Sequence, residues 1–233
     1  VYIRPAPEPD FTINDSLQCL NGNSFVFTNT SSIQSGTVSY KWIFSNTASD
    51  TSVVASPTKV YTTADTFAVK LIVTSNFGCR DSVTKNVYVF PKPDMAFTVN
   101  DSDQCFTGNS FAFTNGSSIS SGTVNYRWQF SSNPADTSVL SNPTKNYTST
   151  GVFPITLVGT SDHGCKDSIG GNMTVYAEPL SGFSINDTDQ CLNGNNFIFT
   201  DTSVVGGLYN RQWTFGDGSG STIAAPSKSY ATA

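Results

Sequence analysis

Residues 13–19 read Ile-Asn-Asp-Ser-Leu-Gln-Cys, residues 99–105 read Val-Asn-Asp-Ser-Asp-Gln-Cys, and residues 185–191 read Ile-Asn-Asp-Thr-Asp-Gln-Cys. The three stretches are 86 residues apart, so Cys19 is matched by Cys105 and Cys191. A period this long lets each copy bury its own core, whereas the units of solenoid proteins, about 20 to 50 residues long, cannot. The sequence therefore predicts a string of separate domains.

The phase of the repeat sets the expected domain boundaries. Residues 1–5 align with residues 87–91, so residues 1–9 are expected to be the last strand of a preceding repeat plus a linker. Complete repeats are expected at 10–93 and 94–179, and a repeat truncated before its last strands at 180–233. The 233 residues are thus interpreted as a piece of a longer protein. The alternative, in which a neighbouring subunit supplies strands to the third repeat, stays open.

The local patterns predict an all-β fold. Short runs of β-branched and aromatic residues, bounded by Asn-Gly, Ser-Gly or Pro, recur within each copy, as at residues 25–28, 40–44 and 67–73. Roughly seven strands per copy favour an immunoglobulin-like β-sandwich. The pattern Tyr-x-Trp-x-Phe would point three aromatic rings at one core, which makes the tryptophans core anchors; they are Trp42, Trp128 and Trp213. The alternative is that they form exposed platforms for sugar rings.

Composition narrows the function classes. Hydrophobic residues make up 37% of the chain and charged residues only 12%, with a net charge of −5. A chain with no basic surplus is a poor ligand for nucleic acid or anionic lipid. No stretch approaches the ~20 apolar residues of a membrane span. The sequence predicts an extracellular protein, secreted or at the cell surface.

The cysteines repeat with the domains. Cys19 and Cys79 are 60 residues apart, as are Cys105 and Cys165. This spacing predicts one disulfide within each complete copy, Cys19 with Cys79 and Cys105 with Cys165, and leaves Cys191 unpaired by truncation. Disulfides indicate an oxidising compartment, and buried free thiols are the alternative. Metal ligation by cysteine is not expected, because the cysteines are isolated and His163 is the single histidine.

Proline-containing linkers join the copies. The segment Val-Phe-Pro-Lys-Pro at 89–93 leads straight into the next copy, and Val-Tyr-Ala-Glu-Pro at 175–179 does the same. Short linkers with proline are semi-rigid, so the domains are expected to follow end to end as a rod.

Two segments resemble a known family. Residues 213–218, Trp-Thr-Phe-Gly-Asp-Gly, resemble the Trp-x-Phe-Gly-Asp-Gly signature of the polycystic kidney disease (PKD) domain, and Asn-Pro-Thr-Lys-Asn-Tyr at 142–147 resembles its next conserved segment. In the first two copies Phe44-Ser45-Asn46 and Phe130-Ser131-Ser132 replace the Phe-Gly-Asp-Gly turn, so a role tied to that turn is in doubt there. The cysteine-bearing type is similar to repeats of large secreted surface proteins and adhesins of Bacteroidetes.

The resemblance implies an immunoglobulin-like β-sandwich without catalysis. The function expected from it is a structural or adhesive segment of a secreted or cell-surface fibre or stalk. The alternative is a set of spacer modules in a secreted polysaccharide-degrading enzyme. Expected partners are neighbouring repeats of the same long chain, and other copies in a filament or surface glycans and proteins. No enzyme activity and no cofactor are expected, because no nucleophile and base recur between copies.

Two weaker patterns suggest ligands or modification. Carboxylates alternate in two of the three copies, which suits calcium; they are Asp101, Asp103, Asp187 and Asp189. A solvated turn is the competing interpretation. Asp-Ser followed by an aliphatic residue resembles the acceptor of Bacteroidetes O-glycosylation and occurs at Ser16, Ser82 and Ser168. The competing interpretation is a turn that opens a strand.

Overall fold

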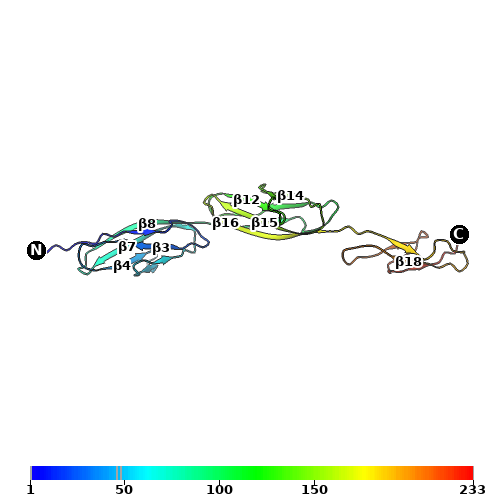
Figure 1. The fold of residues 1–233 in the computed structure, drawn as a ribbon, viewed down its shortest axis with the longest axis horizontal. Coiled ribbons are helices and arrows are strands. Elements are labelled where there is room, and N and C mark those ends of the chain that lie inside the picture. Colours follow the sequence, from blue (N-terminus) through cyan, green and yellow to red (C-terminus); the bar gives the residue numbers. More distant parts are fainter. Residues whose placement is uncertain (1, 46, 48, 233) are drawn as a thin grey trace.

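The computed structural model describes residues 2–45, 47 and 49–232, so Val1, Asn46, Ala48 and Ala233 lie outside it. Over these residues the secondary structure consists of strands and contains no helix. The strands form three successive domains that follow one another along one axis, with the two ends of the chain at opposite ends of the molecule (Figure 1). The fold is therefore all-β and arranged end to end.

The first domain is a sandwich of two sheets. One sheet has the order β1-β3-β6 and the other β2-β8-β7-β4-β5. The strands are β1 (Phe11–Ile13), β2 (Leu17–Cys19), β3 (Phe25–Asn29), β4 (Val38–Ile43), β5 (Thr51–Ser52), β6 (Thr58–Lys59), β7 (Asp65–Ser75) and β8 (Arg80–Phe90). All neighbours pair antiparallel except β2, which runs parallel to β8.

The second domain repeats this topology. Its sheets have the orders β14-β11-β9 and β10-β16-β15-β12-β13, and β10 again runs parallel to β16. The strands are β9 (Phe97–Val99), β10 (Asp103–Cys105), β11 (Phe111–Asn115), β12 (Val124–Gln129), β13 (Thr137–Ser138), β14 (Thr144–Lys145), β15 (Gly151–Ser161) and β16 (Lys166–Tyr176).

Aromatic side chains fill both cores. Trp42 and Trp128 are each 0% exposed, and the ring of Phe11 packs edge-on against Trp42. The indole N–H of Trp42 donates to the Val54 carbonyl at 2.9 Å, and that of Trp128 donates to Leu140 at 3.0 Å. Full burial is tolerated because this single polar group is satisfied. Neither tryptophan can serve as an exposed sugar platform.

A buried tyrosine closes each sandwich. The hydroxyl groups of Tyr61 and Tyr147 donate to the carbonyls of Phe44 and Phe130 at 2.9 and 2.7 Å. Burial is the main cause that raises the pKa of both phenols, so they remain protonated hydrogen-bond donors across the physiological range.

The third domain has one three-stranded sheet and a two-stranded fragment. Its strands are β17 (Phe183–Ile185), β18 (Phe197–Asp201), β19 (Trp213–Thr214), β20 (Gly220–Ser221) and β21 (Ser227–Lys228). The described residues contain no counterpart of β7 and β8 here, so Trp213 is only partly buried and Phe183 is exposed. Trp213 therefore packs less completely than the two tryptophans before it.

Candidate functional site

The candidate site is the joint between the first two domains. On the first domain it begins at Cys19, the last residue of β2. Because β2 runs parallel to β8, Cys19 lies opposite Phe90, at the end where the chain leaves the domain. The amide of Leu20 continues this pairing by donating to the Phe90 carbonyl at 2.8 Å. The parallel strand thus carries a cysteine to the exit of the domain.

The loop after Cys19 is held by one buried amide side chain. Gly22 adopts a left-handed φ of 79°, which turns the chain into Asn23. The Asn23 side chain donates to the carbonyls of Leu20 at 2.7 Å and Tyr61 at 2.9 Å, and accepts from the Tyr61 amide at 2.8 Å. A fully bonded amide of this kind fixes the position of the loop.

The second domain offers the tip of its longest hairpin. Strands β15 and β16 are joined by residues 162–165, with Gly164 at a φ of 79°. The Cys165 amide donates to the Ser161 hydroxyl oxygen at 3.1 Å, and the Ser161 amide donates to the Cys165 carbonyl at 2.8 Å. These bonds hold Cys165, which is buried, at the end of the domain that faces the first one.

A disulfide joins Cys19 to Cys165 across the joint. Their Cα atoms are 5.5 Å apart and the two residues are separated by 146 positions in the sequence. Cys79, Cys105 and Cys191 are free thiols in the structure. The bond therefore links neighbouring domains.

The expected pairing of Cys19 with Cys79 and of Cys105 with Cys165 is wrong. Cys79 precedes the first residue of β8, while Cys19 lies opposite its last residue. An 11-residue strand separates the two ends by roughly 35 Å, and a disulfide requires Cα atoms within about 7 Å. Strand β16 separates Cys105 from Cys165 in the same way.

Two further contacts accompany the disulfide. The ring of Phe90 stacks on His163 with centroids 3.7 Å apart and planes 13° apart. Lys92 in the linker forms an ion pair with Asp167 of β16 at 2.5 Å. The hydrogen bond from Lys92 is the main cause that holds the pKa of Asp167 below its usual value. A covalent bond, a stacked pair and an ion pair therefore fix the angle between the domains.

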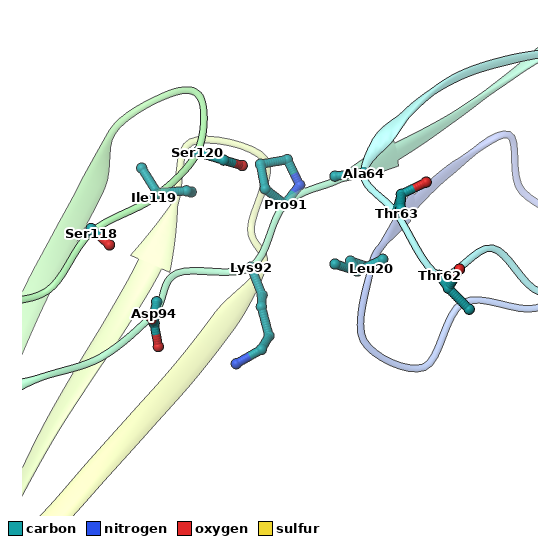
Figure 2. A pocket seen from close by; sticks show the side chains of 10 residues that line it. All are labelled: Leu20, Thr62, Thr63, Ala64, Pro91, Lys92, Asp94, Ser118, Ile119 and Ser120. Carbon is teal, nitrogen blue, oxygen red and sulfur yellow. The ribbon is translucent and has the colours of Figure 1, made fainter.

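An open groove runs beside the linker. It has a volume of about 530 Å³ and is lined by Leu20 and residues 62–64 of the first domain, linker residues that include Pro91, and residues 118–120 of the second (Figure 2). The next residues anchor the linker: Asp94 pairs with Ser118, and Met95 is buried in the second core. The groove follows from the domains meeting at their ends.

An aspartate–lysine ion pair lies near the tyrosine that closes each sandwich, a region that we call the tyrosine corner. Asp217, in the Phe-Gly-Asp-Gly turn, pairs with Lys228 at 2.6 Å. The first two domains lack that turn, yet Asp50 pairs with Lys59 and Asp136 with Lys145, both at 2.5 Å. In the first two domains the role of the turn is therefore kept by an aspartate eight positions after Trp42 and Trp128, which our prediction missed.

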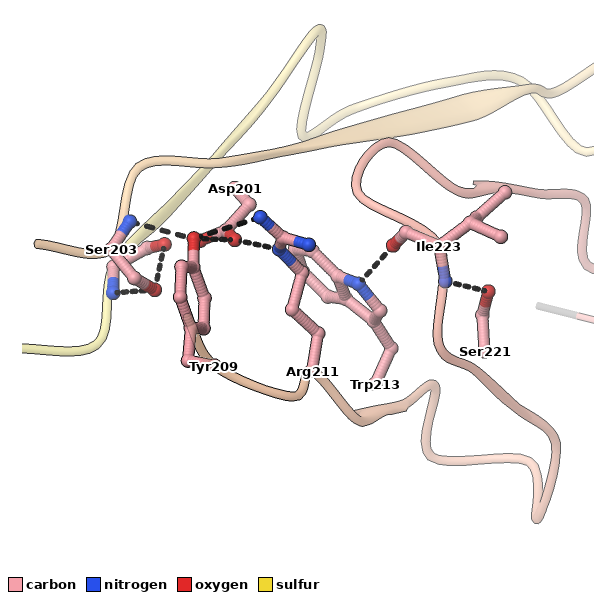
Figure 3. A network of polar contacts seen from close by, with 8 residues as sticks. Asp201, Ser203, Tyr209, Arg211, Trp213, Ser221 and Ile223 are labelled. Carbon is pink, nitrogen blue, oxygen red and sulfur yellow. Dashed lines mark hydrogen bonds and ion pairs between the residues drawn. The ribbon is translucent and has the colours of Figure 1, made fainter. Parts of the chain in front are cut away.

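A polar network stabilises the third domain. The Asp201 carboxylate accepts hydrogen bonds from the Tyr209 hydroxyl at 2.7 Å, from the Ser203 amide at 2.9 Å and from the Arg211 guanidinium (Figure 3). The Ser203 side chain is the main cause that holds the pKa of Asp201 well below its usual value, followed by the Tyr209 hydroxyl and the Arg211 guanidinium. Nearby, the Trp213 indole donates to the Ile223 carbonyl at 2.9 Å. All donors come from the same domain, so we assign the network to local stability.

The carboxylates proposed for calcium hold turns. Asp101 accepts from the Asp103 amide at 3.0 Å and Asp187 accepts from the Asp189 amide at 3.0 Å. Within the described residues no three acidic, histidine or cysteine side chains gather as a metal site. Turn capping is thus the observed role of Asp101 and Asp187, while the Asp103 carboxylate accepts from the hydroxyl groups of Ser102 and Tyr176. Calcium binding by the four aspartates stays a prediction.

The proposed glycosylation serines differ in setting. Ser82 and Ser168 lie within β8 and β16 and are exposed, so the competing interpretation, a turn that opens a strand, does not describe their environment. Ser16 is partly buried next to β2. Modification of all three stays a prediction.

These features define a class of protein: tandem immunoglobulin-like β-sandwich modules joined end to end. The family model described as PKD domain matches residues 4–90 and 92–175. The two matches span well over half of the sequence, and the chain belongs to the PKD domain family. No curated protein matches the chain.

Several solved structures are similar to parts of this chain. The PKD1 domain of Vibrio anguillarum Epp is 28% identical over 37% of this chain and 96% of its own, with a TM-score of 0.33. The PKD1 domain of the Vibrio cholerae metalloprotease PrtV is 35% identical over 36% and 96%, with a TM-score of 0.32. Three immunoglobulin domains of titin are 12% identical over 92% and 86%, with a TM-score of 0.42. Among the described residues, none forms a helix long and apolar enough to cross a membrane.

Proposed function

We propose that this chain is a non-catalytic structural segment of a large secreted or cell-surface fibre or stalk protein, with adhesion as the role of the assembled fibre. The observation that supports the proposal is the disulfide between Cys19 and Cys165, which locks two sandwiches end to end. A joint with a covalent bond and two further contacts holds its domains at one angle. Fixed spacing is what a stalk requires and what a flexible tether would lack.

The same bond supports the proposed location. Structural disulfides persist in oxidising compartments and are rare in the cytosol. The chain is also rich in residues with uncharged hydroxyl and amide groups, and only 12% of its residues are charged. Both features favour a protein that works outside the cell.

Small-angle X-ray scattering of the whole chain tests the stalk. Three domains of roughly 40 Å each give a rod about 120 Å long, whose radius of gyration is about 35 Å. A compact protein of this length has a radius of gyration of about 17 Å. A value near the compact one would contradict the proposal. The Cys105→Ser variant, which removes a free thiol, is the matched control for the Cys19→Ser variant, whose joint we expect to bend more.

A further inference from the structure

We infer that the Cys19–Cys165 bond is one member of a repeating series, in which Cys105 and Cys79 each bind a further domain of this same class through an equivalent disulfide. The inference goes beyond the proposed function, because a rod of these three domains does not require it. It assigns a partner to two thiols and to the surfaces around them.

We call the end of a domain at which the chain leaves it the exit face, and the opposite end the entry face. The exit face of the second domain repeats that of the first. Cys105 lies opposite Tyr176 in the parallel pair, as Cys19 lies opposite Phe90. The Phe106 amide donates to the Tyr176 carbonyl at 2.9 Å, and the Asn109 side chain holds this loop as Asn23 holds the first. The cysteine is therefore presented in the same geometry.

This second exit face is uncovered. Tyr176 is 54% exposed and Phe106 is 39% exposed. Their counterparts, Phe90 and Leu20, face the second domain and are partly buried, and Phe90 carries the stacked contact. The second domain thus exposes an aromatic surface at the positions where the first domain contacts its neighbour.

The entry face of the first domain repeats that of the second. Cys79 follows the tip of the β7–β8 hairpin, its amide donates to the Ser75 hydroxyl oxygen at 3.2 Å, and Gly78 has a φ of 84°. Phe77 occupies the place of His163 and is 41% exposed. Cys79 is therefore held where Cys165 is held.

An independent contact shows that this entry face receives the equivalent residue. Arg4, which aligns with Phe90, lies over the Phe77 ring with its guanidinium carbon 4.2 Å from the centroid. The pair Arg4 and Phe77 therefore repeats the stack of Phe90 on His163, with a cation above the ring. The entry face of the first domain therefore already has the counterpart of the stacked contact, and what it lacks is the counterpart of the disulfide, at Cys79.

The partner is identified by this chemistry. The partner of Cys79 must present a thiol at the end of a parallel strand, as the first domain presents Cys19. The partner of Cys105 must present a cysteine at the tip of a hairpin, as the second domain presents Cys165. A PKD domain of this cysteine-bearing type carries both features, one at each end. The ion pair is not part of the requirement, since Ala6 and Glu178 stand at the position of Lys92. Each bond forms when two thiols lose two protons and two electrons to a disulfide oxidant, which is reduced to two thiols.

A tandem chain tests the inference with native segments in the native phase. Residues 1–175 followed directly by residues 4–233 place Arg4 at the position of Tyr176, so Cys105 and the second Cys79 are again 146 positions apart. After oxidation with a glutathione redox buffer, we expect non-reducing peptide mapping to recover most of Cys105 joined to the second Cys79. Recovery of Cys105 as a free thiol, with both Cys19–Cys165 bonds formed, would overturn the inference.

A second tandem chain tests the entry face against an exit face of known geometry. Residues 1–89 followed by residues 4–233 insert a copy of the first domain between the first and the second, so the first Cys19 meets the second Cys79 at the same 146-position separation. We expect these two residues to be joined. If the first Cys19 is free or bonded elsewhere, the inference is refuted even where the first tandem chain fails to fold. The 233-residue rod and its scattering curve would be unaffected, so this failure is distinct from a failure of the proposed function.

Discussion

A pulling force applied between the two termini of the oxidised chain should bypass most of the first two domains. The force passes along the backbone to Cys19, crosses the disulfide to Cys165, and continues toward the third domain. The 146-position segment between the two cysteines is a closed side loop. A fully extended residue spans about 3.5 Å, so the loop hides roughly 500 Å of contour length.

The Cys19→Ser variant should release this length. Each of its first two domains should unfold in a step of about 260 Å, because 86 extended residues span about 300 Å and the folded domain already spans about 40 Å. In the oxidised wild type the force path through these two domains contains only about 30 residues. These span about 100 Å when extended, against about 80 Å when folded, so we expect a gain of only about 20 Å.

Single-molecule force spectroscopy on chains tethered at both termini measures these steps. Cys105→Ser is the matched control, because it removes a cysteine that forms no bond in the structure, and its trace should match the wild type. Reductant should convert the wild-type trace into that of Cys19→Ser. Two steps of about 260 Å in the oxidised wild type would refute the assigned pairing, because the force would then be passing through the domain cores.

Three further predictions concern stability. Trp128→Ala should lower the free energy of unfolding by about 3 to 5 kcal/mol, measured by urea denaturation, whereas Leu140→Ala at an exposed site should change it little. Asn109→Ala should cost about 1 to 3 kcal/mol by the same measurement, because it leaves buried backbone groups unpaired. The lowered pKa of Asp167 means that its ion pair with Lys92 stabilises the joint fully above the ordinary carboxyl pKa of about 3.9, and that this stabilisation is lost as the pH falls from there through the lowered pKa. Scattering of the Cys19→Ser variant should therefore show a more bent joint at acidic pH, and the added Asp167→Asn change should remove this pH dependence.

The sequence was sufficient for the fold because the fold depends on local patterns. The alternation around Trp42 places that ring in the core, and the strand runs agree with the sheets that form around it. The resemblance to the PKD domain rests on segments that pack in the core and at the tyrosine corner. The family match confirms the resemblance to the PKD domain, and the structure confirms the all-β fold.

The joint could not be predicted in the same way, because periodicity does not decide between neighbours. If cysteines repeat every 86 residues, a separation of 60 within a copy implies a separation of 146 between copies, as between Cys19 and Cys165, and the period itself favours neither. The deciding element is β2, a three-residue strand whose parallel pairing with β8 separates Cys19 from Cys79. Strands this short carry no clear periodic signal. The aspartate at position 50 was missed for a similar reason, since only its contact with Lys59 shows that it replaces the acid of the altered turn.

The connectivity has a consequence for any array in which the inferred series continues. From Cys165 to Cys191, and from Cys79 to Cys105, the backbone runs 26 positions and crosses two domains. Extended, 26 residues span about 90 Å, while two folded domains already span about 80 Å. These segments would therefore form two interleaved straps that are almost fully extended in the native state. The 60-position segments between Cys19 and Cys79, which contain most of each core, would carry no tension. Such an array would keep nearly the same length even if individual cores unfolded, because the length is set by the straps and the stability by the side loops.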